Sequence, residues 1–147
     1  MGKASRAPKR KKVEKWVCRI PDYWPPSPNV IGGWHWRQKY RASKLAADYV
    51  QAYGTPLPAF VGPVLLKIVR EWGYNQRALD PDNLVASVKP LIDALRAPKR
   101  QNEQKNRLSV IEDDRPDAFE GGAPDVQQRR AHGKEKRTVI VVTGVEA

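Results

Sequence analysis

Short apolar runs rich in β-branched residues mark the predicted strands of this chain. Residues 16–20 form the first such run, which Pro21 ends, and residues 61–69 form a second, more apolar one. The charged pair Arg70 and Glu71 follows the second run and predicts its end. Runs bounded by prolines or charges are typical of strands, so the second run predicts a buried strand of about six or seven residues.

Two longer segments carry apolar residues near helical spacing. Residues 36–53 have this pattern, with basic residues in their first half, and Gly54 and Pro56 stop it. Residues 81–97 repeat it after Asp80, a typical helix cap, and here proline occupies the first helical position. Pro90 lies inside this second segment and lacks a backbone N–H, so we expect a kink or a split into two short helices.

Two further predicted strands, residues 126–131 and 137–145, complete the elements, and residues 138–142 in the second are β-branched. A turn-like segment separates them, so we expect these two strands to pair as a hairpin. Residues 96–107 form a polar, basic connection that is longer than usual. The length of the chain predicts that these strands and helices form a single domain.

Basic residues outnumber acidic ones in this chain. It has 147 residues and a formal net charge of +11, and seven of its 27 Lys and Arg residues precede Trp16. We expect residues 1–15 to form a disordered basic tail, because they carry almost nothing to bury, and residues 16–147 to form the folded domain. A solubilising role is one interpretation of the tail, and contact with a nucleic-acid backbone is the other. The candidate contacts in the tail are Lys9, Arg10, Lys11 and Lys12.

Cysteine content and hydropathy indicate the cellular compartment. Cys18 is the single cysteine, so no internal disulfide can form, and we expect it to be a small buried hydrophobe in the first strand. No apolar run approaches the roughly 20 residues of a membrane span, and the N-terminal segment lacks the apolar core of a signal peptide. These features predict a cytoplasmic protein without membrane association.

Aromatic and basic side chains lie together where the first helical segment begins. Trp34 and Trp36 could stack on unpaired bases while Arg37, Lys39 and Arg41 bind phosphates. Packing of one of the two tryptophans onto the sheet is the alternative. The basic connection supplies further candidate DNA contacts: Lys99, Arg100, Lys105 and Arg107.

Carboxylates gather where the second helical segment begins. Asp80 stands at the predicted cap and Asp82 follows two residues later, so both are close enough to share a cation. On a continuous helix Asp82, Lys89 and Asp93 return to within about 20° of one face. Capping by Asp80 and Asp82, with an i,i+4 ion pair between Lys89 and Asp93, would explain the same residues without a metal.

A further pair of carboxylates follows a short apolar run, residues 108–111. Adjacent side chains of an extended chain point to opposite faces, so we expect only one of Asp113 and Asp114 to face the helix start. Carboxylates gathered in one cleft repel each other unless a hard cation binds them, and oxygen ligands suit Mg²⁺, with Mn²⁺ as a substitute. Such a cation would polarise a phosphodiester, and Lys89 would offset charge that develops in the transition state.

These residues resemble the signature of a known nuclease family, the RusA-type Holliday junction resolvases. Three motifs carry the resemblance: Asp80-x-Asp82-Asn83-Leu84, Lys89 four residues before Asp93-Ala94-Leu95, and Asp113-Asp114. The proline-rich segment 20–29 resembles the opening of that family, and the whole resemblance covers roughly residues 16–145. Lys89 stands three residues further from Asp-Asn-Leu than in the best-known pattern.

The resemblance implies a small α+β domain in which two main helices pack on a small mixed β-sheet. It also implies a homodimeric endonuclease that requires magnesium and nicks opposing strands of four-way DNA junctions. It assigns Asp80, Asp82 and Asp114 as the catalytic, metal-binding carboxylates, Asp113 as an alternate ligand and Lys89 as the catalytic lysine. Such resolvases are often carried by phages, so the implied setting is the cytoplasm of a bacterium or a phage-infected host cell. Two alternatives stay open: a non-catalytic protein of the same fold that binds branched DNA, and a basic RNA-binding or assembly protein that uses the tail.

Overall fold

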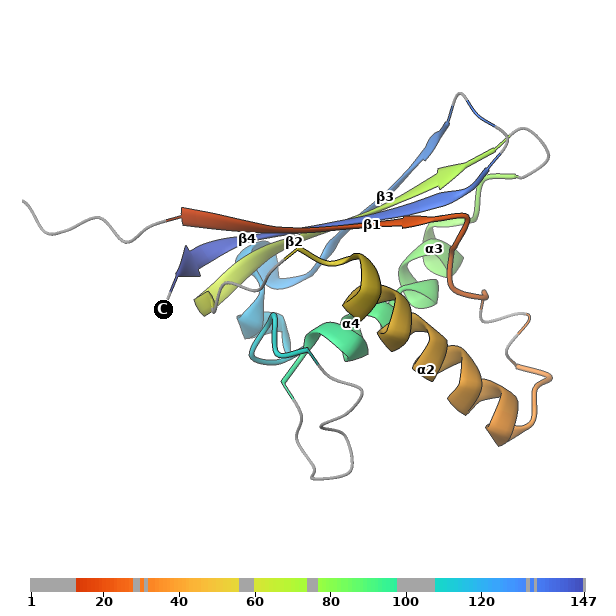
Figure 1. Ribbon diagram of the computed structural model, residues 1–147, viewed down its shortest axis with the longest axis horizontal. Helices are drawn as coiled ribbons and strands as arrows, with labels where there is room; N and C mark the ends of the chain where they lie inside the picture. Colours follow the sequence, from red (N-terminus) through yellow and green to blue (C-terminus); the bar gives the residue numbers. More distant parts are fainter. Residues whose placement is uncertain are drawn as a thin grey trace, which may run out of the picture.

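The computed structural model describes residues 13–27, 30, 32–55, 60–73, 77–97, 108–131, 133 and 135–146. Within this part of the chain, four strands form one sheet, and all the helices lie on one of its faces (Figure 1). The predicted class, a small α+β domain with helices packed on a mixed sheet, is confirmed. None of the described helices is long and apolar enough to cross a membrane.

The strands of the sheet lie in the order β1-β4-β2-β3. β1 (Val13–Pro21) and β2 (Phe60–Trp72) flank β4 (Arg137–Glu146) and run antiparallel to it, whereas β3 (Asp125–Arg130) pairs in parallel with β2. The predicted hairpin is therefore wrong: both late strands exist, but β2 lies between them. β4 pairs along nearly its whole length with β1, of nine residues, and β2, of 13 residues, which forms more ladder hydrogen bonds than the six-residue β3 could supply.

β2 is longer than its apolar run predicts. It has 13 residues and continues through Arg70 and Glu71, the charged pair expected to end it. Both residues are nevertheless buried, with 7% and 4% of their whole-residue surface exposed, because polar groups from neighbouring segments pair with their side chains. β1 also extends beyond its prediction: it begins at Val13 and so includes the last three residues of the expected tail.

α2 (Trp36–Tyr53) has the predicted bounds, and local contacts explain both ends. His35, an exposed residue, is its N-cap. Its Nδ1 accepts the Arg37 N–H at 3.3 Å, and its own N–H donates to Gln38 Oε1 at 3.0 Å, which forms a capping box. The helix ends at Gly54, where a Cβ atom would lie 2.5 Å from the ring of Trp16.

The second helical segment is split, as Pro90 predicted. α3 (Pro81–Ser87) and α4 (Lys89–Leu95) are separated at Val88, whose ψ of −5° departs from helical values. Ser87 ties the end of α3 to the segment after β1, because its hydroxyl donates to Leu84 O at 2.7 Å and accepts from Trp24 Nε1 at 3.0 Å.

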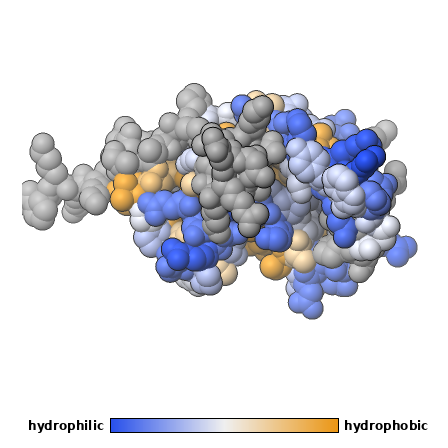
Figure 2. Space-filling view, turned by 90° about the horizontal axis from the view of Figure 1, so that it is seen from below, coloured by the Kyte–Doolittle hydropathy of each residue, from blue (hydrophilic) through white to orange (hydrophobic). Residues whose placement is uncertain are grey.

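The hydrophobic core lies between the sheet and the helices. Leu66 and Ile68 of β2 face inward and are buried together with Trp16 of β1 and Leu91 of α4. Cys18 also belongs to this core, as predicted, and its burial raises the pKa of the thiol to about 12. The helix side of the molecule is mostly hydrophilic, with small apolar patches between charged side chains (Figure 2).

Candidate functional site

A side-chain amide on β3 holds the segment that leads into α3. Gln128 Nε2 donates to Leu79 O at 2.7 Å, and Leu79 N–H donates to Gln128 Oε1 at 2.9 Å. Arg70, opposite Gln128 on β2, donates to Arg77 O at 3.0 Å and to the same Gln128 oxygen at 3.4 Å. Burial lowers the pKa of the Arg70 guanidinium. Because Leu79 directly precedes Asp80, these contacts determine where α3 begins relative to the sheet.

Replacing Gln128 by Ala should lower the free energy of unfolding by about 1–3 kcal/mol, because both backbone groups of Leu79 would lose a partner. Gln127→Ala is the matched control, since Gln127 is exposed on the same strand and bonds only to Asp125 nearby. The control should change stability by less than about 0.5 kcal/mol. Urea denaturation measures both variants, and equal effects would contradict the proposed role of Gln128.

The two acidic residues at the start of α3 are exposed to solvent. Asp80 occupies the N-cap position, but its carboxylate makes no hydrogen bond to the helix backbone. It accepts one instead from Asn83 Nδ2 at 3.3 Å. Side-chain capping, the alternative explanation for Asp80, is therefore wrong for this carboxylate. Asp82 lies in the first helical turn, where exposed backbone N–H groups favour a negative charge.

A hollow of about 170 Å³ lies beside α4, and we call it the acidic hollow. Three charged residues line it: Lys89 and Asp93 of α4, and Asp114. Lys89 Nζ lies 3.6 Å from Asp93 Oδ1, and Arg96 Nε lies 3.8 Å from the same oxygen. The expected i,i+4 ion pair is thus present, while the Lys89 side chain stays 74% exposed. An ammonium group so placed can reach a bound anion at the surface.

Backbone hydrogen bonds to the end of α4 bring Asp114 to this hollow. The N–H groups of Val110 and Ile111 donate to Leu95 O at 2.8 and 3.1 Å, and Leu108 N–H donates to Ala94 O at 2.9 Å. These bonds satisfy carbonyl groups that a helix end otherwise leaves without partners. Val110 and Ile111 are also buried, so the short apolar run anchors the segment that carries Asp114.

Asp113 and Asp114 point in different directions, as predicted for adjacent residues. Asp114 lines the acidic hollow, whereas Asp113 Oδ2 lies 2.9 Å from Arg115 Nε. Asp113 Oδ1 also accepts the backbone N–H of Asp114 at 2.7 Å. Asp113 therefore helps to shape the turn, and Asp114 is the one of the two that faces Lys89 and Asp93.

Asp80 and Asp82 do not line the acidic hollow. The expectation that Asp82 shares a face with Lys89 and Asp93 assumed a continuous helix, and the break at Val88 interrupts it. No group of three His, Cys, Asp or Glu residues in the described part of the chain is close enough to hold a metal ion, so the three-carboxylate set with Asp114 is not assembled there. Mg²⁺ is usually held by one or two carboxylates together with water and substrate phosphate, and a hollow lined by two aspartates suits that chemistry.

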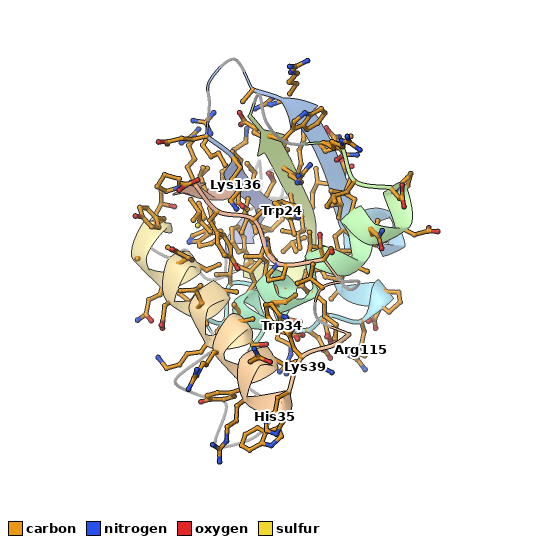
Figure 3. All side chains as sticks on the ribbon, turned by 90° about the vertical axis from the view of Figure 1, so that its right-hand side faces the viewer. Trp24, Trp34, His35, Lys39, Arg115 and Lys136 are labelled. Carbon is orange, nitrogen blue, oxygen red and sulfur yellow. The ribbon has the colours of Figure 1, made fainter. Side chains whose placement is uncertain are left out.

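The predicted stacking tryptophans differ in exposure. Trp36 is 65% exposed, with the Arg37 guanidinium 5.4 Å from its ring centre. Trp34 is half-buried and lines a shallow, largely apolar hollow of about 280 Å³ with Arg41. Arg37, Lys39 and Arg41 are exposed near the start of α2. Figure 3 shows this end of the helix, with Trp34 and Lys39 labelled. The other predicted DNA contacts lie outside the described residues: Lys9, Arg10, Lys11, Lys12, Lys99, Arg100, Lys105 and Arg107.

The described residues therefore bring one lysine and two aspartates together, Lys89 with Asp93 and Asp114. Asp80 and Asp82 lie at the start of the preceding helix, and exposed cations and aromatics lie at the start of α2.

Comparisons of this chain with protein-family models, with curated proteins and with solved structures give no significant match, and they neither support nor contradict the RusA-type resemblance.

Proposed function

We propose that this protein is a structure-selective DNA endonuclease that cuts Holliday junctions or related branched DNA by Mg²⁺-dependent phosphodiester hydrolysis. The observation that carries the proposal is the acidic hollow, where two separate segments of a chain with net charge +11 present Lys89, Asp93 and Asp114 together. A lysine beside carboxylates on a basic protein suits a polyanionic substrate, because the overall charge attracts the phosphate backbone.

The acidic residues would hold the cation. Asp93 and Asp114 line the hollow, and Asp80 and Asp82 are the further candidates on α3. The bound Mg²⁺ supplies charge that polarises a phosphodiester oxygen. Lys89 acts on the substrate in this proposal, since its mostly exposed ammonium can lie against a non-bridging phosphate oxygen and offset the charge that develops there. Asp93 orients Lys89 through their ion pair.

Recognition of branched DNA is assigned to the start of α2. Trp36 is exposed on a helix whose first turns also carry Arg37, Lys39 and Arg41, a mixture that suits unpaired bases and their phosphates. We further propose a homodimer, because a four-way junction needs two symmetric cuts and a two-fold axis would supply two identical sites. The implied setting is the cytoplasm of a bacterium or a phage-infected cell.

A non-catalytic protein that binds branched DNA is the second candidate. The observation that favours it is the arrangement around Asp93, which Lys89 and Arg96 already neutralise, with no group of three carboxylates nearby among the described residues. Such a protein would keep the exposed cations of α2 and would need no metal.

Cleavage assays with four-way, flap and linear duplex DNA, with and without Mg²⁺, separate the two candidates. We expect nicking of the four-way junction only with Mg²⁺, and no cutting of the linear duplex, because the exposed tryptophan and cations at the start of α2 suit unpaired bases and their phosphates. Tight binding to the junction without nicking in Mg²⁺, Mn²⁺ or Ca²⁺ would favour the non-catalytic candidate. A melting temperature that no divalent cation raises would point the same way.

A further inference from the structure

A second and larger hollow lies at the end of the sheet where β2 and β3 end and β4 begins. Its volume is about 840 Å³, and we call it the basic hollow. Four cations line it: Arg129, Arg130, Lys136 and Arg137. Its only acidic lining residues among those described are Asp22, Glu71 and Glu135. None of these cations belongs to the acidic hollow or to the start of α2.

A buried carboxylate orders two of these arginines. Glu71 lies directly opposite Arg129 on β3 and Arg137 on β4, so it stands between them in the sheet. Its Oε1 accepts from Arg129 Nη2 at 3.0 Å, and both of its oxygens accept from Arg137 Nη2 at 3.0 Å. Burial alone would raise the pKa of Glu71, but the hydrogen bonds and charges of the two arginines outweigh it and lower the pKa. Glu71 therefore stays ionised at neutral pH and holds both guanidinium groups.

The two arginines keep donors that face solvent. Their side chains are 64% and 47% exposed, whereas that of Glu71 is 6% exposed. A guanidinium carries five N–H donors, and Glu71 accepts from a single nitrogen of each arginine. The shared carboxylate thus fixes two arginines in place and leaves their outer donors directed at the hollow, an arrangement that suits phosphate oxygens.

Two further cations add charge that Glu71 does not offset. Arg130 is exposed and Lys136 is half-buried, and neither makes an ion pair with a described residue. The sequence from Arg129 to Arg137, both included, contains five Lys and Arg residues and one acid, Glu135. The hollow is also too polar for a typical small-molecule pocket, whose lining is mostly apolar.

The basic hollow lies where an extended polyanion could make a second contact with the protein. In Figure 1 the end of the sheet, α3 and the start of α2 follow one another along one side of the molecule. Figure 3 views that side, with Lys136 near the sheet and His35 and Lys39 at the far end of α2.

We propose that the basic hollow binds the sugar-phosphate backbone of a DNA arm, with Arg130, Lys136 and the outer donors of Arg129 and Arg137 as its contacts. The inference rests on the proposed function only in taking DNA as the polyanion. Glu71 is a positioning residue, because it acts through the two arginines and does not face the phosphate.

The Arg130→Ala/Lys136→Ala double variant tests the hollow without exposing a buried charge, since both residues lie outside the Glu71 contacts. We expect its Kd for a synthetic four-way junction at low salt to rise about tenfold, and the slope of log Kd against log salt to fall by about 1–2. The matched control is Arg19→Ala/Lys67→Ala, which removes two exposed cations from β1 and β2 and should leave Kd and slope close to those of the unchanged protein.

The outcomes distinguish this inference from the proposed function. A double variant that binds the junction with unchanged Kd and unchanged salt slope would overturn the inference, even if the unchanged protein cuts junctions. An unchanged Kd and salt slope are also what we expect if the basic hollow binds an acidic protein segment and not DNA. A protein that cuts no DNA, but whose affinity falls in the double variant and not in the control, would overturn the endonuclease proposal and support the basic hollow.

Discussion

Replacing Asp114 by Asn should reduce Mg²⁺-dependent cleavage of a four-way junction by about 100-fold or more, while binding changes by less than about threefold. Asp114 lines the acidic hollow opposite Lys89 and Asp93, and the amide keeps its size but cannot supply a negative charge to a cation. The measurement is single-turnover nicking at saturating protein, with junction affinity determined separately in Ca²⁺.

Asp117→Asn is the control for this experiment. Asp117 lies three residues later in the same segment, its side chain is 75% exposed, and it does not line the hollow. Normal cleavage by Asp114→Asn would show that the acidic hollow is not the catalytic site.

Asp82→Asn tests whether α3 contributes to the metal site. We expect this variant to abolish cleavage with binding largely intact. Normal cutting would remove Asp82 from the metal site.

Replacing Trp16 by Ala should lower the free energy of unfolding by about 3–5 kcal/mol, a large share of the roughly 5–15 kcal/mol available to a domain. Trp16 is fully buried at the junction of β1 and the end of α2. Its Nε1 donates to Thr55 O at 3.0 Å, and its ring fills the space that a Cβ atom on Gly54 would occupy. The variant therefore loses both packing and a buried hydrogen bond.

Trp36→Ala is the matched control for Trp16, since the same side chain there is 65% exposed. We expect it to change the free energy of unfolding by less than about 0.5 kcal/mol. Chemical denaturation followed by circular dichroism measures both variants. Equal losses at the two positions would contradict the description of the core.

Local signals in the sequence predicted the helices well. The bounds of α2 follow from helical spacing that Gly54 and Pro56 interrupt, and the break between α3 and α4 follows from Pro90. Each of these effects acts within a few residues, so no knowledge of the tertiary structure is needed. Only Asp114 of the acidic pair lines the acidic hollow, but this hollow lies beside α4 and not at the start of α3, where the sequence placed it.

The features that sequence reasoning missed depend on contacts between distant residues. A β-branched run shows that a strand exists but not which strand pairs with it, and so β3 and β4 were expected to be neighbours. Arg70 and Glu71 resembled the end of a strand because charged side chains seldom lie in a core. Their partners come from distant segments: Arg70 donates to the segment that precedes α3, and Glu71 accepts from arginines of β3 and β4. Gln128 bonds to Leu79 across 49 positions and leaves no local pattern. The one available signal was the cluster of arginines at 129, 130 and 137, which complements an acid elsewhere.

The course of β1 along the edge of the sheet sets the distance between two basic parts of the chain. Its nine residues lead from Val13, where the basic N-terminal segment joins the sheet, to Pro21, which lines the basic hollow. At about 3.3 Å per residue these two points are about 26 Å apart, which equals about eight base-pair steps of a duplex. If DNA contacts both the basic N-terminal segment and the basic hollow, a duplex shorter than this cannot bridge them.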